Sequence, residues 1–135
     1  MKTPAEIVHL MMESDAFSQW LRIEVTETGL GTCVLTCPVL PQMLNGFHIL
    51  HGGISYSLSD SALAFASNSR GYKCVSIETS ISHTRQAVTG DTLTATCVES
   101  YRGRTQGIYH VEVKNQHDKL VALFKGTVRI SAEIW

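Results

Sequence analysis

One acidic side chain stands alone in an uncharged stretch of the chain. Asp60 is the only formally charged residue between His51 and Arg70, and the stretch opens with Gly52-Gly53. Two glycines at a helix start would leave its first backbone N–H groups open to an incoming group. A carboxylate in such surroundings is unfavourable unless something pairs with it. Asp60 is therefore either a structural residue bonded to nearby Ser or Tyr hydroxyls or a catalytic group, and its spacing slightly favours catalysis.

The stretch His51–Asn68 is predicted to form a helix, because it is rich in Ala, Leu and Phe and is followed by Gly71, which can end it. At about 100° per residue, one apolar stripe is made of Ile54, Leu58, Ala62 and Phe65. Asp60 falls on the other side with Gly53, Tyr56, Ser57 and Ala64. That side carries small, weakly polar residues instead of Lys, Glu or Gln, so the helix is predicted to be buried nearly all round.

The bulk composition excludes several classes of protein. The 135 residues fit a single domain, residues 1–135, and the net charge of −1 arises from 11 basic and 12 acidic residues that are interspersed. Interspersed charges of this kind do not predict the basic patch that binds nucleic acid or an anionic membrane. The first residues contain acidic side chains and no long apolar run, so we expect neither a signal peptide nor a membrane span, and a cytoplasmic location.

The four cysteines fall within apolar or alternating runs and lack Cys-x-x-Cys spacing; they are Cys33, Cys37, Cys74 and Cys97. We expect reduced core thiols, neither disulfides nor a zinc site. His48 and His51 are the other candidate metal ligands. They flank a helix start with no carboxylate or cysteine at ligand spacing, so no metal site is expected.

Short-range patterns place the remaining elements. Thr3-Pro4-Ala5-Glu6 predicts a capped helix start, and a half-buried strand is expected from the alternation that begins after Trp20 and runs over Leu21, Ile23 and Val25. A second strand is expected from Thr32 to Cys37, and the segment from Pro38 to Leu50 is expected to be a loop.

Four more strands are expected after Gly71. They pass through Val75 to Ile81, Leu93 to Cys97, Tyr109 to Val113 and Leu120 to Ile130, the last with a bulge at Gly126. The tally predicts an α+β fold, in which an antiparallel sheet of about six strands curls round one long central helix, with a short N-terminal helix. One sheet cannot cover both faces of the central helix. We therefore predict an isologous homodimer with paired central helices.

The segment Asn45-Gly46-Phe47-His48-Ile49-Leu50-His51-Gly52-Gly53, followed by Asp60, resembles the signature of hotdog-fold acyl-CoA thioesterases, particularly the phenylacetyl-CoA thioesterase type. Asn68-Ser69-Arg70-Gly71 and Gly90-Asp91-Thr92-Leu93 resemble that subgroup as well. The likeness covers nearly the whole chain. The order Asn, six residues to His and nine more to Asp is its more specific part. Gln86 follows Arg85 where many relatives have Pro, so the coenzyme-facing turn is expected to differ.

The resemblance implies a role for each of five residues. Asp60 would be the catalytic carboxylate, as general base or nucleophile, and the Gly52 backbone N–H would polarise the thioester carbonyl. Asn45 would help to hold the water or acyl group, and His51 would orient the loop and substrate. Ser76 matches a position at which related enzymes use a hydroxyl.

Thioester hydrolysis needs an activated water and a stabiliser for the oxyanion, and N–H groups at a helix start supply the second. Asp60 lies eight residues after Gly52, or about 12 Å along one helix, which is too far for both to contact one carbonyl. A site shared across a dimer is the simpler interpretation. The resemblance implies the same, often with dimers paired into a tetramer.

Substrate-binding residues are less defined by the sequence. Arg85, Arg102 and Arg104 fall in expected turns, where they are either partners for coenzyme A phosphates or ordinary solvated charges. Gly53 and Tyr56 would also contact substrate, although Tyr56 could equally belong to the core. No cofactor is expected, because coenzyme A is part of the substrate.

The sequence thus predicts an acyl-CoA thioesterase that acts on an aryl-acyl or related acyl-CoA. Two alternatives remain open. The first is a hotdog hydratase or dehydratase, which would need His-Asp or His-Glu chemistry on an enoyl or hydroxyacyl thioester. The second is a non-catalytic acyl-CoA-binding protein.

Overall fold

The computed structural model describes residues 1–135 as helices, strands and the loops between them. Its elements in chain order are α1 (Pro4–Ser14), α2 (Ala16–Trp20), β1 (Glu24–Gly29), β2 (Thr32–Pro38), the 3-10 turn η1 (Pro41–Met43), α3 (Gly52–Asn68), β3 (Tyr72–His83), β4 (Thr92–Arg102), β5 (Gln106–Lys114) and β6 (Leu120–Ile134). The long helix and the strand-rich second half agree with the sequence pattern.

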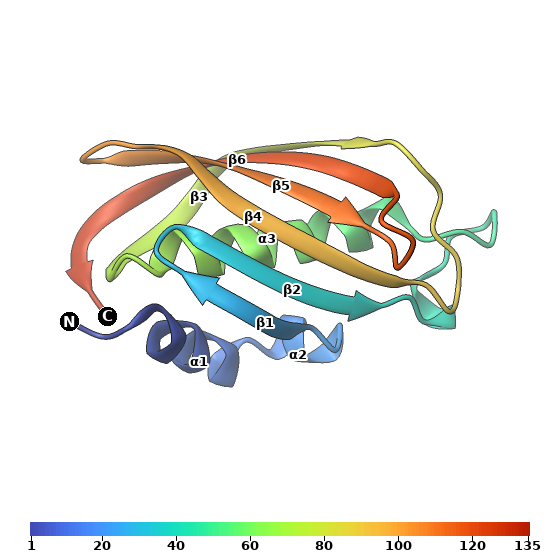
Figure 1. Ribbon diagram of the computed structural model, residues 1–135, viewed down its shortest axis with the longest axis horizontal. Helices are drawn as coiled ribbons and strands as arrows, with labels where there is room; N and C mark the ends of the chain where they lie inside the picture. Colours follow the sequence, from blue (N-terminus) through green and yellow to red (C-terminus); the bar gives the residue numbers. More distant parts are fainter.

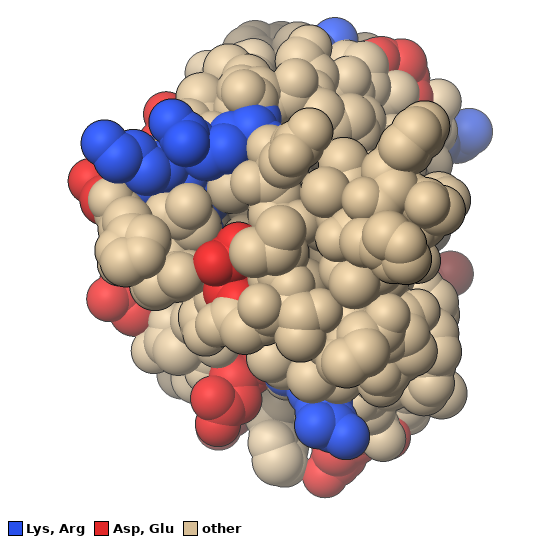
Figure 2. Space-filling model, turned by 90° about the vertical axis from the view of Figure 1, so that its right-hand side faces the viewer, with Lys and Arg blue, Asp and Glu red and all other residues tan.

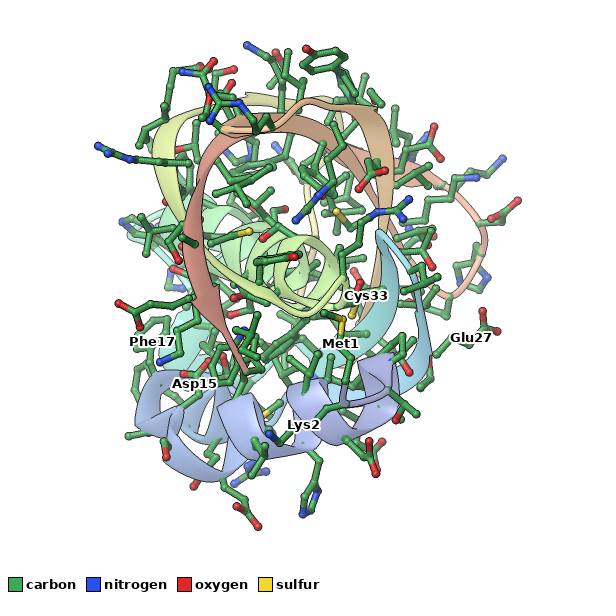
Figure 3. The ribbon with its side chains drawn as sticks, turned by 90° about the vertical axis from the view of Figure 1, so that its left-hand side faces the viewer. Met1, Lys2, Asp15, Phe17, Glu27 and Cys33 are labelled. Carbon is green, nitrogen blue, oxygen red and sulfur yellow. The ribbon has the colours of Figure 1, made fainter.

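The six strands form one antiparallel sheet in the order β1-β2-β4-β5-β6-β3. The sheet curves around α3, while α1 and α2 lie below it on the side that the sheet leaves open (Figure 1). The view along α3 shows the same arrangement, with the sheet folded around the helix and the N-terminal helices beneath (Figure 3). The predicted α+β fold with a central helix is confirmed.

The buried side of α3 is the predicted apolar stripe. Leu58, Ala62 and Phe65 have no exposed surface and belong to a single core with the inward-facing residues of the sheet. All four cysteines lie in this core as free thiols. The other side of the helix is only half-buried within one chain, including Tyr56 and Asp60. The prediction of a helix buried nearly all round therefore does not hold for a single copy.

The N-terminal segment contains a helix that was not expected. Thr3 and Glu6 form the predicted capping box, but the chain then begins a second helix, α2, capped by Asp15. Arg22 has a left-handed φ of 57°, and the Ile23 N–H donates to the Ser18 carbonyl, so the chain is still turning where a strand was predicted. The strand begins only at Glu24. Leu21 and Ile23 are both buried, as in the predicted strand, but a tight turn buries them instead of a strand.

Gly126 does not form the predicted bulge. It pairs in register with Tyr109 and Thr79, and the irregularity lies in β3, between Ser76 and Glu78. A Cβ at Gly126 would lie 2.4 Å from Cδ2 of Leu63. Glycine is needed there because α3 packs its leucine directly on the strand backbone.

Strand β3 is a long edge strand with only β6 beside it. Its outward side chains include Val75, which is 66% exposed, and Ile77, which is 53% exposed. A twelve-residue edge with exposed apolar side chains is a template for pairing with another strand. It adjoins α3, whose outer side is the half-buried one. No helix of the chain is both long and apolar enough to span a bilayer.

Candidate active site

The N-terminus of α3 presents one open backbone donor. His51 is the N-cap, and its Nδ1 accepts the Gly53 N–H at 2.8 Å. The next N–H along the chain, that of Ile54, donates to the His51 carbonyl, whereas no group of the chain accepts from the Gly52 N–H. The sequence predicted that both glycine N–H groups would be open. Only Gly52 has this property, because His51 caps the second.

The loop before α3 is held together by Asn45. Its side-chain Oδ1 accepts the N–H groups of Phe47 at 2.9 Å and Ile49 at 3.4 Å, and its backbone N–H donates to the Ile49 carbonyl at 2.8 Å. Leu44 and Leu50 then pair as an isolated bridge. Asn45 thus fixes the path of the chain into His51. Its side-chain amide nitrogen has no partner and is the group left to contact a ligand.

A pocket of about 340 Å³ opens beside Gly52. Its polar lining comes from Gly52 and Ser55 on α3 and from the residues 83–86 that follow β3, including His83 and Arg85. Figure 2 faces this end of the molecule, where most of the surface is uncharged and Lys and Arg side chains gather along one edge. The structure therefore brings Arg85, a predicted substrate-binding residue, to the same pocket as the open N–H donor.

His83 is a residue of this pocket that the sequence reasoning missed. Its Nε2 lies 3.0 Å from the point at which a Cβ on Gly52 would stand, and its Nδ1 lies 3.3 Å from Ser55 Oγ. The alternating pattern of β3 could have predicted that His83 lies at a strand end. The pattern could not predict that this strand end meets the start of α3, because that contact depends on the pairing of β3 with β6.

Asp60 lies in the middle of α3 and is half-buried. Burial is the main cause that raises the pKa of its carboxyl, and the negative charge of Asp15 raises it further. No group of the chain donates a hydrogen bond to Asp60, so the structural alternative, a carboxylate bonded to Ser or Tyr hydroxyls, is not what one chain shows. A raised pKa and a free carboxylate are typical of a group with a chemical role.

Asp15 reaches this region through a chain of hydroxyls. Its carboxylate accepts from the N–H and Oγ of Ser18, and Ser18 Oγ lies 2.8 Å from the Oγ of Ser61, the residue after Asp60. Figure 3 shows Asp15 between the N-terminal helices and the body of the chain. The buried serine pair thus fixes α2 against α3 beside Asp60.

Tyr56 and Ser76 lie along the uncovered side of the chain. The hydroxyl of Tyr56 is hydrogen-bonded to Thr79 Oγ1, and its ring packs edge-on against Phe124. Ser76 is exposed on β3. Neither lines the pocket at Gly52 within one chain.

The other two predicted arginines lie away from the pocket at Gly52. Arg102 donates to the Ser67 carbonyl at 3.0 Å and to the Tyr109 hydroxyl at 2.9 Å, which makes it a structural link in this chain. Arg102 and Arg104 also line a separate cavity of about 490 Å³. One chain therefore gathers His51, Gly52, Gly53 and Arg85 at one end, and leaves Asp60, Ser76, Arg102 and Arg104 apart from them.

Comparisons with known proteins show which family the chain resembles. Residues 47–122 match the family described as the thioesterase superfamily. The chain is 42% identical over 118 residues to the acyl-coenzyme A thioesterase PaaI of Escherichia coli, which covers 87% of this chain and 84% of that protein. The solved structure of the E. coli PaaI protein from the phenylacetic acid degradation operon superposes with a TM-score of 0.95 at 38% identity, covering 97% and 95% of the two chains. A hypothetical thioesterase of Streptococcus pneumoniae, solved with coenzyme A, superposes with a TM-score of 0.86 at 25% identity, covering 96% and 98%.

Proposed function

The chain belongs to the thioesterase superfamily, and from this membership we propose that it hydrolyses an aryl-acyl or related acyl-coenzyme A thioester to the free acid and coenzyme A. The observation that carries the proposal is the open Gly52 N–H at the positive end of a 17-residue helix, within a pocket that Arg85 also lines. The coenzyme A in the related streptococcal structure supports the class of substrate.

In the proposed reaction, the thioester carbonyl accepts a hydrogen bond from the Gly52 N–H. Asp60 removes a proton from the attacking water, or attacks the carbonyl itself, and negative charge develops on the carbonyl oxygen. The N–H and the helix dipole stabilise that charge, and losing one such donor typically costs about 10²–10³ in rate. Asn45 and His51 orient the substrate, and Arg85 binds a coenzyme A phosphate. The N–H and the carboxylate supply the charges that the reaction needs, so the proposal includes no metal or redox cofactor.

The site is proposed to be completed by a second copy of the chain. Tyr56 lies midway in sequence between Gly52 and Asp60, and its hydroxyl bonds to Thr79 on β3. A two-fold axis passing near Tyr56 would pair the two central helices antiparallel. It would place Asp60 of the partner subunit near Gly52 and Ser76 of the partner subunit near the end of β3. It would also cover the exposed Val75 and Ile77.

The proposal also includes one expectation that the family resemblance implies, about assembly, and one that follows from the composition of the chain, about location. The homodimer would pair again into a dimer of dimers, and the enzyme would act in the cytoplasm, where reduced thiols persist. The four free, buried cysteines are compatible with that compartment.

The proposed activity is tested by free-thiol release from a panel of acyl-coenzyme A substrates, with phenylacetyl-, benzoyl- and short straight-chain acyl groups. We expect turnover with an aryl-acyl member and loss of most of kcat in Asp60→Asn, with its oligomer unchanged. Loss of enoyl absorbance without thiol release would favour a hydratase instead. Tight binding of the whole panel without turnover would favour a non-catalytic binding protein.

A further inference from the structure

The imidazole of His83 lies directly on the start of α3. Its Nε2 is 3.0 Å from the point where a Cβ on Gly52 would stand, a separation that only the absence of that Cβ permits without displacing the ring. His83 also lines the pocket at Gly52. A carbonyl that accepts from the Gly52 N–H would therefore bring its thioester sulfur within reach of Nε2.

The hydrogen bonds around Ser55 orient the His83 ring. Ser55 has one hydroxyl proton, and it donates this proton to the Gly52 carbonyl at 3.1 Å. When Ser55 donates there, its oxygen accepts from the second neighbour, which is Nδ1 of His83 at 3.3 Å. That arrangement leaves Nε2, the ring nitrogen that lies nearest Gly52, free to give a proton to a ligand.

Nothing in the chain occupies Nε2. His83 pairs in the sheet with Ala122 of β6, and the other pocket residues near it are Ser55, Thr84, Gln86 and the cation Arg85. No carboxylate of the same chain forms an ion pair with the ring. A proton on Nε2 is therefore available to a ligand and is not held by an internal partner.

We propose that His83 is a catalytic residue that gives its Nε2 proton to the departing sulfur of the thioester. The inference rests on the proposed hydrolysis of acyl-coenzyme A. Asp60 of the partner subunit takes a proton from water as the water oxygen bonds to the carbonyl carbon, and the Gly52 N–H holds the oxyanion. When the intermediate collapses, the carbon–sulfur bond breaks, its electron pair goes to sulfur, and the Nε2 proton goes to the same atom. The products are the acid and the free thiol. The enzyme is restored when Asp60 of the partner subunit releases its proton to solvent and His83 takes one up from solvent.

The test compares two leaving groups on one acyl group. The N-acetylcysteamine thioester has an alkyl thiol, which leaves poorly without a proton, whereas the thiophenyl ester has a more acidic thiol, which leaves well as the thiolate. We expect His83→Gln to lower kcat/KM for the alkyl thioester and for the coenzyme A thioester about 10²-fold, the typical size of a general-acid effect. The thiophenyl ester should lose less than about tenfold.

A second variant and a control keep the result interpretable. His83→Ala should regain activity on the alkyl thioester when imidazole is added, because the small base can occupy the vacated space, and the thiophenyl ester should gain little. His110→Gln, an exposed histidine on β5 away from the pocket, should behave as wild type with both esters. Equal losses with both leaving groups in His83→Gln, or no loss with either, would overturn the role of His83 while wild-type turnover still supports the thioesterase. A wild-type protein that releases no thiol from any ester would overturn both.

Discussion

Nδ1 of His51 lies 2.8 Å from the backbone nitrogen of Gly53 and accepts its proton. This bond divides the two glycines into a capped donor and an open one. Replacing His51 with Ala should cost about 1 kcal/mol of stability through the lost cap and should lower kcat at least tenfold, because the helix start is no longer fixed. His51→Asn, which restores a capping side chain, should recover the stability in thermal unfolding. Equal stability of the Ala and Asn variants would contradict the capping role.

A methyl group at Gly52 should lower activity by crowding the pocket. In Gly52→Ala the new Cβ would stand 3.0 Å from His83 Nε2, beside the N–H proposed to bind the carbonyl. The backbone N–H is kept, but the methyl group blocks the approach of a carbonyl to it, so we expect kcat/KM to fall about 10²-fold, the size typical of a lost oxyanion donor, with the fold retained. Gly46→Ala is the matched control, since nothing lies within 4 Å of a Cβ there. Similar activity in the two variants, measured by thiol release, would argue against the pocket as the site.

Asp60→Asn should stabilise the protein while it inactivates it. The pKa of Asp60 is raised in the fold, so the ionised carboxylate opposes folding, and this unfavourable effect is absent only at pH values low enough to protonate the carboxyl in both states. The variant should therefore match wild type near pH 3, below the ordinary Asp pKa of 3.8, and should have a higher Tm than wild type near pH 7. Asp118→Asn, which changes a carboxylate at an exposed turn, should change Tm little at either pH. A lower Tm for Asp60→Asn at pH 7 would contradict this account.

The charge of Asp15 should set the acid limb of the pH–rate profile. Its negative charge contributes to the raised pKa of Asp60, so more of the base is protonated at mildly acidic pH. In Asp15→Asn that repulsion disappears while an N-cap side chain is kept, and the acid limb of kcat/KM should move to lower pH. Glu13→Gln, which changes an exposed charge nearby, should leave the limb in place. A limb that does not move in Asp15→Asn would show that Asp15 acts only as a cap.

The contact of Gly126 with Leu63 should be essential to the packing of α3. Gly126→Ala would place a Cβ 2.4 Å from Cδ2 of Leu63, and overpacking of this kind typically destabilises by about 1–3 kcal/mol. Adding Leu63→Ala removes the clash, so the double variant should be more stable than the sum of the two single changes predicts. Additive free energies of unfolding in urea would contradict the direct contact.

Periodicity was sufficient to predict the sheet and the central helix, because both depend on which residues face the core. Periodicity failed where the backbone turns at a position that has no glycine or proline to indicate a turn. The alternation of Leu21 and Ile23 resembles a strand, but Arg22 adopts a left-handed conformation and α2 precedes it. At Gly126, the sequence predicted a bulge, whereas glycine is needed there because Leu63 of α3 packs against it.

The candidate site was predictable only in the part that lies within one local motif. His51, Gly52 and Asp60 share one local motif, so their spacing along a helix follows from sequence. His83 meets Gly52 only because β3 pairs with β6 and ends beside the helix start, a relation between elements that short-range patterns do not contain. The donation of the Gly53 N–H to His51 was likewise hidden, since it depends on a side-chain rotamer.

Mixing two inactive variants tests the shared site most directly. Asp60→Asn and Gly52→Ala subunits, refolded together, form heterodimers in which one site joins an intact Gly52 to an intact Asp60. With random pairing, half of the dimers are mixed and one of their two sites is complete, so about a quarter of wild-type kcat should return. Confirmed heterodimers that release no more thiol than either parent would contradict a site built from two copies of the chain.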